Sequence, residues 1–316
     1  AIIGGASGIG RGWQMLVECL AEGRGISLPA QSTAAAKTMA RFTGAYARVR
    51  EQFGLPIGRF EVVEGALARI AGRTYQMDAA RLLTLYALDH GEKPAVITAI
   101  VKYHLTERMR EVVNAAMDVQ GGSGIMLGPN NLIGRAYQAV PISITVEGAN
   151  LLTRGLIIFG QGATRAHPYL LEEIAAAAEP DPALALDKFD RVLMRHGGHV
   201  ASNLARSVLL GLTRGRLAQV PGDASTRREQ QRLEWLCGAF ALAADVTLLA
   251  LGGALKRREQ LSGRLGDALS ELYLASAALR HYEVQGRPRK DLPLLKGALE
   301  DNFAAIQRAL VGVCDN

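Results

Sequence analysis

Apolar residues recur at helical spacing along almost the whole chain, and this pattern limits the possible folds more than any other feature. Stretches that alternate apolar and polar residues, as strands do, are almost absent. The sequence therefore predicts an all-α protein of 316 residues. The clearest example follows Pro94, a residue suited to a first helical position. The residues that would share one face of this helix are Ile97, Ile100, Val101, Leu105, Met109, Val112, Val113 and Ala116.

Glycine and proline clusters divide this helical pattern. The run 121–124, Gly-Gly-Ser-Gly, should end a helix, and we expect a loop from there to about Val146. A new helix is then expected from about Gly148 to Phe159. Residues 175–182 indicate a helix end followed by a linker, so we place a domain boundary near residue 180. Residues 1–180 would form one helical bundle, and residues 181–316 a second helical region.

The second region has its own breaks. Residues 213–225 contain two glycines, a proline and an aspartate, and are expected to form a loop. Two long helices should follow between Arg227 and about Tyr282, joined near Gly252 and Gly253. The apolar window 236–255 is long enough to span a bilayer. It contains Asp245, which would be costly in lipid, so a buried bundle helix is the favoured interpretation.

Charge and cysteine content exclude some function classes. The net charge is +6, but acidic and basic residues are interspersed, and no Lys/Arg block is interleaved with aromatics. Nucleic-acid binding is therefore not expected. The cysteines Cys19, Cys237 and Cys314 are far apart and form neither a metal-binding spacing nor a disulfide framework. We accordingly expect a reducing, cytoplasmic location.

The N-terminal segment contains a motif that its context does not support. Residues 4–10 match the glycine-rich turn of short-chain dehydrogenases, which approaches a dinucleotide pyrophosphate. Only two apolar residues precede it, so no strand is visible, and no tyrosine has a lysine four residues later. A nucleotide-binding dehydrogenase is therefore a minor alternative. The opening Ala1-Ile2-Ile3-Gly4 is not a usual start, which suggests a piece of a longer protein.

Glu147 is the strongest candidate for a chemical role. It ends the apolar segment 141–146 and precedes a glycine at an expected helix start. Desolvation of a carboxylate favours proton uptake, which a general base requires. The alternative is a carboxylate that only stabilises the helix N-terminus.

Three further motifs accompany Glu147. They are Glu22-Gly23-Arg24-Gly25, the run Arg50-Glu51-Gln52-Phe53-Gly54, and Asp118-Val119-Gln120-Gly121-Gly122. Their order and spacing resemble the C-terminal helical domain of acyl-CoA dehydrogenases, which has an Arg-x-x-Phe-Gly motif, a Gly-Gly-x-Gly turn and a Glu-Gly pair. The resemblance is closest to the large bacterial fatty-acid β-oxidation enzymes with an additional C-terminal helical region. Stretches that resemble this subgroup are 13–20, 159–163, 167–169 and 251–259.

The resemblance implies a role for each matching residue. Glu147 would abstract the proton α to the thioester carbonyl of an acyl-CoA, and a hydride would pass from the β-carbon to FAD. Arg24 and Gly148 would lie at the acyl-CoA site. Arg50 and Phe53 would touch the FAD of a neighbouring subunit. Further cofactor-binding positions would be Gly121, Gly122 and Ala149.

The same resemblance implies partners. These are an electron-transfer flavoprotein or similar acceptor and further copies of the chain in a homo-oligomer. Apart from the resemblance, a packing role or a peripheral membrane contact is expected for the region from about residue 185 to 316, which offers no catalytic constellation. The chain would lack the N-terminal helical domain and the middle β-domain of the family, and would bind FAD weakly or not at all alone.

Some residues depart from the family pattern, and alternatives stay open. Asp118 stands where the family often has Gln, while Ala149 and Leu151 replace Thr and Gln after the Glu-Gly pair. Arg24 could be a surface arginine, and Arg50 and Phe53 a helix-end arginine and a core phenylalanine. A helical assembly module without catalysis is the main alternative function.

No metal site is expected from the sequence. His196 and His199 could meet on one helix face, but no nearby cysteine or carboxylate in the sequence completes a ligand set.

Overall fold

A computed structural model describes residues 2–221 and 223–315. Within these ranges the chain is helical almost throughout, which confirms the predicted all-α class. The chain divides into two compact units. The first contains Ala1–Thr153 and Arg280–Ala298, and the second contains Arg154–Leu279 and Leu299–Asn316.

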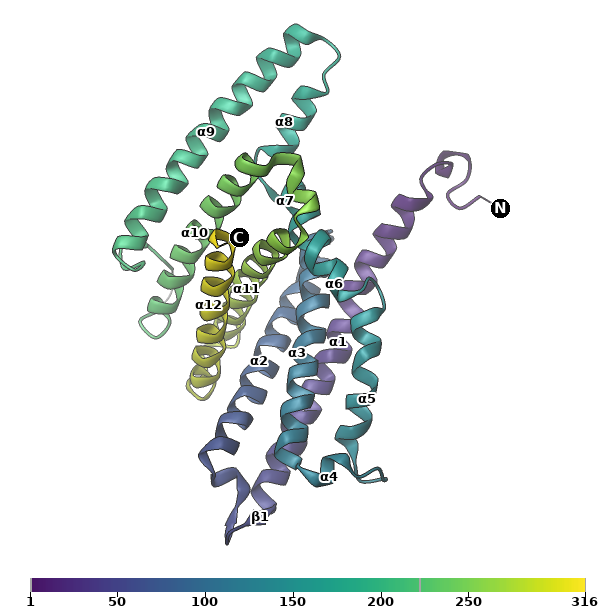
Figure 1. The fold of residues 1–316 in the computed structure, drawn as a ribbon, viewed down its shortest axis with the longest axis vertical. Helices are drawn as coiled ribbons and strands as arrows, with labels where there is room; N and C mark the ends of the chain where they lie inside the picture. The colour runs from purple at the N-terminus through teal and green to yellow at the C-terminus, as the bar shows by residue number, and fades with distance from the viewer. Residues whose placement is uncertain (1, 222, 316) are drawn as a thin grey trace. The chain divides into compact units, whose positions relative to one another are not determined.

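Three long helices form the body of the first unit. They are α1 (Gly12–Val49), α2 (Glu61–Asp89) and α3 (Ala95–Gln120), which lie side by side in Figure 1. The face of α3 predicted from the apolar spacing is buried, and Ile100, Leu105 and Val113 are almost fully inaccessible. Met77 of α2 is buried as well. Burial of apolar faces is the main stabilising term in such a bundle.

A small hairpin connects α1 to α2. Strand β1 (Glu51–Gln52) pairs antiparallel with β2 (Leu55–Pro56), and the short helix η2 (Ile57–Arg59) follows. Phe53 and Gly54 both have positive φ angles, of 52° and 78°. A two-residue hairpin turn of type I′ requires positive φ at both central residues. The sequence analysis missed this hairpin because each strand has only two residues, too few for any alternation to register.

The segment before Glu147 is a helix, so the predicted loop is wrong there. As predicted, Gly121 ends α3, with a φ of 61°. The short helix α4 (Gly122–Ile125) is followed by α5 (Leu132–Thr145). The Asn131 side chain caps α5 by accepting from the Gly134 N–H at 2.7 Å. Ile133 and Val140, one heptad apart, bury the same face. The sequence analysis missed α5 because it extended the loop that follows the glycine run to about Val146, although Pro141 lies inside this helix.

Helices continue after Glu147. A turn leads into α6 (Asn150–Leu152), a wide π-helical stretch η3 (Thr153–Gln161) and α7 (Gly162–Ala166). The predicted helix from about Gly148 to Phe159 therefore exists, but it starts two residues later and runs further.

The second unit has the predicted breaks. Helix α8 (Leu170–Ala177) ends before the linker, and α9 (Pro182–Leu212) begins after Asp181, whose side chain accepts from the Ala183 N–H at 3.0 Å. The predicted loop separates α9 from α10 (Arg227–Leu251). The short helix η4 (Gly252–Arg257) then leads to α11 (Glu259–Val284). Residues 280–298, which belong to the first unit, contain the end of α11, the short helix η5 (Arg289–Asp291) and the start of α12 (Leu292–Cys314), and the rest of α12 belongs to the second unit.

Helix α10 and the 3₁₀ turn after it are long and apolar enough to cross a membrane. Asp245 interrupts this stretch, and its carboxylate is buried and hydrogen-bonded within the second unit to His167 and Asn203. Phe159, Ala244 and Leu265 pack in one apolar cluster. These contacts favour the bundle-helix interpretation.

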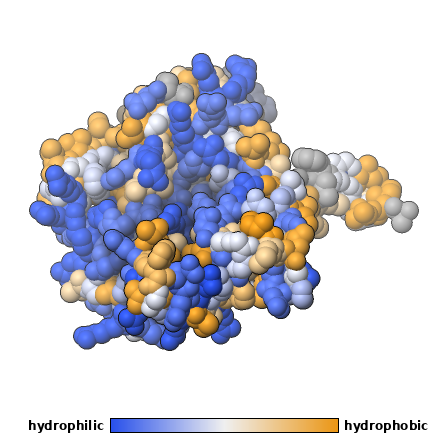
Figure 2. Space-filling view, turned by 60° about the horizontal axis from the view of Figure 1, so that its bottom comes forward, coloured by the Kyte–Doolittle hydropathy of each residue, from blue (hydrophilic) through white to orange (hydrophobic). Residues whose placement is uncertain are grey.

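Many apolar side chains stay exposed in both units. On the face drawn in Figure 2, apolar residues form small groups among hydrophilic ones. On α9, Leu186, Met194 and Leu212 are exposed.

Candidate active site

The turn between α5 and α6 presents Glu147 in an unusual backbone conformation. Glu147 has a φ of 55° and Gly148 a φ of 97°. The left-handed region is costly for a residue with a side chain, and such outliers persist only where surrounding contacts hold them. Three long-range hydrogen bonds from α1 and α3 supply such contacts.

Arg24 of α1 provides the first of these contacts. Its Nε donates to the main-chain oxygen of Glu147 at 2.9 Å across 123 residues of sequence. The side chain is partly buried, and burial lowers the pKa of the guanidinium, while the charge of Glu147 opposes this shift. Arg24 is therefore not a free surface arginine. The structure places it beside Glu147, and its predicted place at an acyl-CoA site stays a prediction.

Lys102 of α3 provides the other two contacts. Its side chain is fully inaccessible, and Nζ donates to the Gly148 oxygen at 2.7 Å and to Asn150 Oδ1 at 2.6 Å. The Asn150 amide in turn donates to Thr106 Oγ1 at 3.0 Å and Glu107 Oε1 at 2.7 Å. Sequence reasoning missed Lys102. A lysine on the apolar face of a predicted helix was the available signal, because a buried lysine needs partners.

The Glu147 carboxylate has one oxygen that accepts no hydrogen bond. Its Oε2 atom is buried and has no hydrogen-bond partner in the described structure. Its Oε1 atom lies beside α1, 4.0 Å from the point where a Cβ on Gly23 would stand. Buried carboxylate oxygens are normally hydrogen-bonded, so an orphaned one marks a site where a ligand proton could be received. The N-cap residue of α6 is Ala149, and α6 has no side-chain cap hydrogen bond, so Glu147 does not cap this helix by accepting a hydrogen bond from it.

Two of the residues after Glu147 are open to solvent. Ala149 is exposed, and Leu151 is 89% exposed. Both positions have room for a ligand, but neither offers a polar side chain. Asp118 is exposed as well.

The other predicted cofactor-binding residues gather at the far end of the same bundle. Arg50 follows α1, and Phe53 at the hairpin tip is 94% exposed, so Phe53 is not a core residue. Gly121 and Gly122 lie nearby, because the Tyr46 hydroxyl donates to the Gln120 oxygen. A Cβ on either glycine would meet no atom within 4 Å.

This end is remote from Glu147 within one chain. The 25 residues of α1 between Arg24 and Val49 span about 40 Å at 1.5 Å per residue. The hairpin and the turn before α6 accordingly lie at opposite ends of the bundle in Figure 1.

A cluster of histidines and carboxylates lies in the second unit. His167 Nε2 is 2.9 Å from Asp245 Oδ1, and His196 Nε2 is 4.0 Å from the same oxygen. Ligand atoms of these three residues lie within 4.8 Å of one another, as in a metal site. The sequence-based reason for excluding one, that no carboxylate is near, is therefore wrong.

Hydrogen bonding argues against a metal at this cluster. His167 Nδ1 accepts from the N–H groups of Tyr169 and Leu170 at 3.2 and 3.3 Å. The ring proton of neutral His167 therefore lies on Nε2 and is donated to Asp245. A metal on Nε2 would leave this ring without a proton, whereas a metal-bound histidine normally donates its other N–H. We assign a hydrogen-bonded cluster.

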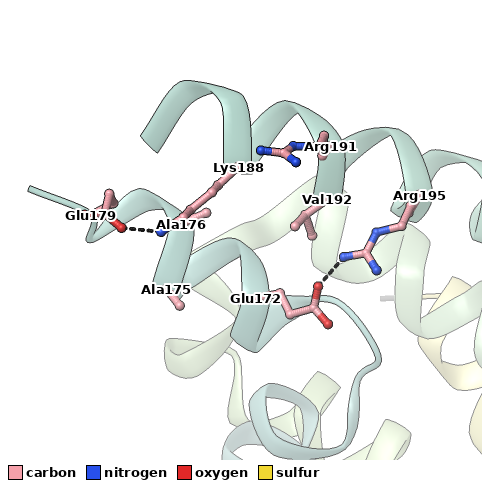
Figure 3. Close-up of a pocket in the computed structure, with 8 residues that line it drawn as sticks. All are labelled: Glu172, Ala175, Ala176, Glu179, Lys188, Arg191, Val192 and Arg195. Carbon is pink, nitrogen blue, oxygen red and sulfur yellow. Dashed lines mark hydrogen bonds and ion pairs between the residues drawn. The ribbon is translucent and has the colours of Figure 1, made fainter. Parts of the chain in front are cut away.

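A pocket of about 840 Å³ lies between α8 and α9 (Figure 3). Its cations are neutralised by local carboxylates: Lys188 pairs with Glu179, and Arg195 with Glu172. This lining provides no unpaired charge set for an anionic ligand.

Comparisons with known proteins identify the family of the chain. The family model "Acyl-CoA dehydrogenase, C-terminal domain" matches residues 10–159, and "Acyl-CoA dehydrogenase, C-terminal, bacterial type" matches residues 164–316. The chain belongs to the acyl-CoA dehydrogenase family. The first match contains Arg24, Lys102 and Glu147, and the second contains the histidine cluster.

Individual relatives match part of the chain. A 3-(aryl)acrylate reductase of Clostridium sporogenes is 29% identical over 145 residues, which are 45% of this chain and 37% of that protein. The probable acyl-CoA dehydrogenase FadE10 of Mycobacterium tuberculosis is 30% identical over 139 residues, 44% of this chain and 21% of that protein.

One solved structure matches nearly the whole chain in fold. It is an acyl-CoA dehydrogenase complexed with FAD from Bacillus anthracis, with a TM-score of 0.74 and 18% identity. The match covers 96% of this chain and 50% of that one. The chain thus spans half or less of the length of these acyl-CoA dehydrogenase relatives.

Proposed function

We propose that this chain supplies the catalytic base and one wall of the active site of an FAD-dependent acyl-CoA dehydrogenase. The observation that carries the proposal is the buried, unpartnered Oε2 of Glu147 on a turn fixed by Arg24 and Lys102. Glu147 would accept the proton α to the thioester carbonyl of an acyl-CoA. The β-hydride would leave to the cofactor, and the product would be a trans-2-enoyl-CoA.

The substrate side of the site follows from the same turn. Loss of the α-proton requires fixed donors for the developing enolate oxygen. The family resemblance assigns this role to the backbone N–H of Glu147. Arg24 and Lys102 fix the neighbouring carbonyl groups, so they preorganise this part of the backbone. Gly148 allows close approach of a substrate, and the exposed Leu151 and Leu152 beside it offer apolar contact.

The described residues fit FAD at the other end of the bundle. FAD, when bound, supplies the flavin that takes up the hydride. The exposed guanidinium of Arg50 suits a pyrophosphate, the exposed ring of Phe53 offers a stacking surface, and open backbone at Gly121 and Gly122 allows close approach. Ala149 would lie beside the cofactor of its own chain.

The separation of these two ends indicates that a second copy of the chain contributes to each cofactor site. The hairpin end and Glu147 are about 40 Å apart along α1. Within one chain, the hairpin residues and Glu147 are therefore too far apart to contact the same flavin ring. We infer a homo-oligomer in which the hairpin of one subunit reaches the cofactor of its neighbour.

Further parts of the proposal rest on the family alone. They are a role in fatty-acid β-oxidation and an electron-transfer flavoprotein or similar acceptor. The proposed cytoplasmic location rests on the three scattered cysteines. A peripheral membrane contact is supported by the exposed apolar residues of α9. A division of function between a catalytic bundle at residues 1–180 and an additional helical domain at 181–316 is likewise proposed. It does not coincide with the two compact units, which divide the chain after Thr153 and assign residues 280–298 to the first unit.

Flavin retention and α-proton exchange together test the function. This chain and a version extended upstream in its native reading frame would be purified, and visible absorbance recorded before and after anaerobic addition of a long-chain acyl-CoA. We expect a yellow extended protein that bleaches, beside a colourless shorter one. A colourless extended protein that ignores acyl-CoA would contradict the proposal and favour a helical assembly module.

Glu147→Gln in the extended protein should keep the flavin and lose deuterium exchange at the substrate α-carbon. Removal of a general base typically costs 10²–10⁴-fold. Glu64→Gln, at an exposed position of α2, is the matched control. Exchange at the wild-type rate in Glu147→Gln would refute the assignment of the base.

A further inference from the structure

We propose that Lys102 is a positioning residue that holds the Glu147 turn in its proton-accepting conformation. The inference rests on the proposed function, because it concerns how the base of that reaction is placed. It is based on the contact between α3 and the turn. There the buried ammonium group of Lys102 donates hydrogen bonds to two oxygen atoms of residues that follow Glu147, the Gly148 main-chain oxygen and Asn150 Oδ1.

The backbone at Glu147 needs an external restraint. A glutamate at a φ of 55° is in a sparsely populated region, and the following glycine adds freedom rather than stiffness. Arg24 restrains the peptide after Glu147 from the side of α1. Lys102 restrains the next peptide from α3, by way of the Gly148 oxygen.

Lys102 also links the turn to the start of α6. The same ammonium group donates to Asn150 Oδ1, and the Asn150 amide is held by Thr106 and Glu107 of α3. The turn is thereby attached to α3 on both sides of Ala149. Loss of the ammonium would leave the Gly148 oxygen with only the longer bond from Thr153 Oγ1, at 3.3 Å.

The charge of Lys102 is poised to change just above neutral pH. Burial and the nearby Arg24 charge lower the pKa of Lys102 to about 8, although Glu147 and Glu107 oppose the shift. These charged groups come from each element around the ammonium: Arg24 from α1, Glu107 from α3 and Glu147 from the turn. Deprotonation would replace two charge-assisted hydrogen bonds by weaker neutral ones, so the turn should loosen as the pH rises.

The experiment uses the enzyme extended upstream in its native reading frame, with Lys102→Met and Lys102→Arg variants. Lys93→Met, at an exposed position before α3, is the matched control. Deuterium exchange at the substrate α-carbon would be measured against pH, together with kcat, KM and flavin content. Exchange reports on proton abstraction alone, and circular dichroism verifies the fold.

We expect Lys102→Met to keep its flavin and lose about 100-fold in exchange and kcat, with KM little changed, because small displacements of reacting groups cost rates of that order. Wild-type exchange should decline above a pH of about 8. Lys102→Arg should retain much of the exchange rate without that decline, because arginine stays protonated.

Two results would overturn the inference while leaving the proposed function intact. One is wild-type exchange in Lys102→Met, and the other is the wild-type pH profile in Lys102→Arg. If Lys102→Met does not fold, the pH dependence of deuterium exchange in Lys102→Arg decides the question. No exchange in the wild-type extended enzyme would instead remove the proposed function, and the inference with it.

Discussion

Replacement of Gly25 by alanine tests the helix contact that places both Arg24 and Lys102 at the turn. A Cβ on Gly25 of α1 would stand 2.6 Å from Thr98 Cγ2 and 3.2 Å from Thr98 Cβ on α3. Carbon atoms in good contact are about 3.5–4.0 Å apart. Lys102 lies one helical turn after Thr98 and on the same face, so any separation of α1 and α3 here would also move Lys102.

The expected size of the effect comes from two opposing terms. Alanine in place of glycine in a helix interior stabilises by about 1 kcal/mol. Overpacking a filled contact costs about 1–3 kcal/mol. Gly25→Ala should therefore lower the free energy of unfolding by up to about 2 kcal/mol. Gly44→Ala is the matched control in the same helix, because its Cβ would meet no atom within 4 Å; it should stabilise by about 0.5–1 kcal/mol.

Urea unfolding followed by far-UV circular dichroism would measure both variants. Hydrogen exchange of peptides from residues 20–30 and 95–105 would locate the change. Thr98→Ser removes Cγ2 while keeping the hydroxyl that donates to the Ala95 oxygen at 3.0 Å, so it should recover part of the loss in Gly25→Ala. Equal stabilisation by Gly25→Ala and Gly44→Ala would refute the close approach of α1 and α3.

Two further predictions concern buried and partly buried polar groups. Asp245→Ala should destabilise the second unit by about 1–3 kcal/mol, because it removes the acceptor of the buried His167 Nε2 and one of the two contacts of Asn203 Nδ2, which keeps His199 Nε2 at 3.0 Å. Asp187→Ala breaks an exposed pair with Arg191 and should cost less than about 1 kcal/mol. Equal melting temperatures of the two variants would contradict this. Burial, with Lys37 contributing, lowers the pKa of His281 below its ordinary 6.5, so the unfolded chain binds more protons just below that pH. Stability should then be intact above a pH of 6.5 and fall as the pH drops through the lowered value, whereas His281→Phe should flatten the unfolding free energy measured between about pH 8 and 5. Identical pH slopes would show that His281 is not responsible.

Several elements could be predicted from the sequence because their signals are local. The apolar spacing on α3, the glycine that ends it at Gly121, and the linker before Pro182 each act within a few residues of their own position. Where a local signal was ambiguous, the prediction was wrong. The loop expected after the glycine run was extended to about Val146, but the N-cap at Asn131 and the apolar face of α5 form a helix there and outweigh the one backbone hydrogen bond that Pro141 removes. The β1–β2 hairpin was too short for any periodicity to reveal it.

The sequence by itself determined the helical class, the family resemblance and the choice of Glu147 as a candidate base. Only the tertiary structure decided that Arg24 and Lys102 hold the turn at Glu147, because these residues are separated by 123 and 45 positions and helical periodicity does not say which helix faces which. The same holds for Asp245, which reads as an isolated charge in an apolar helix until packing brings His167 and Asn203 to it. Local patterns specify elements, whereas the partners of a buried polar group depend on long-range packing, where every such group must be satisfied.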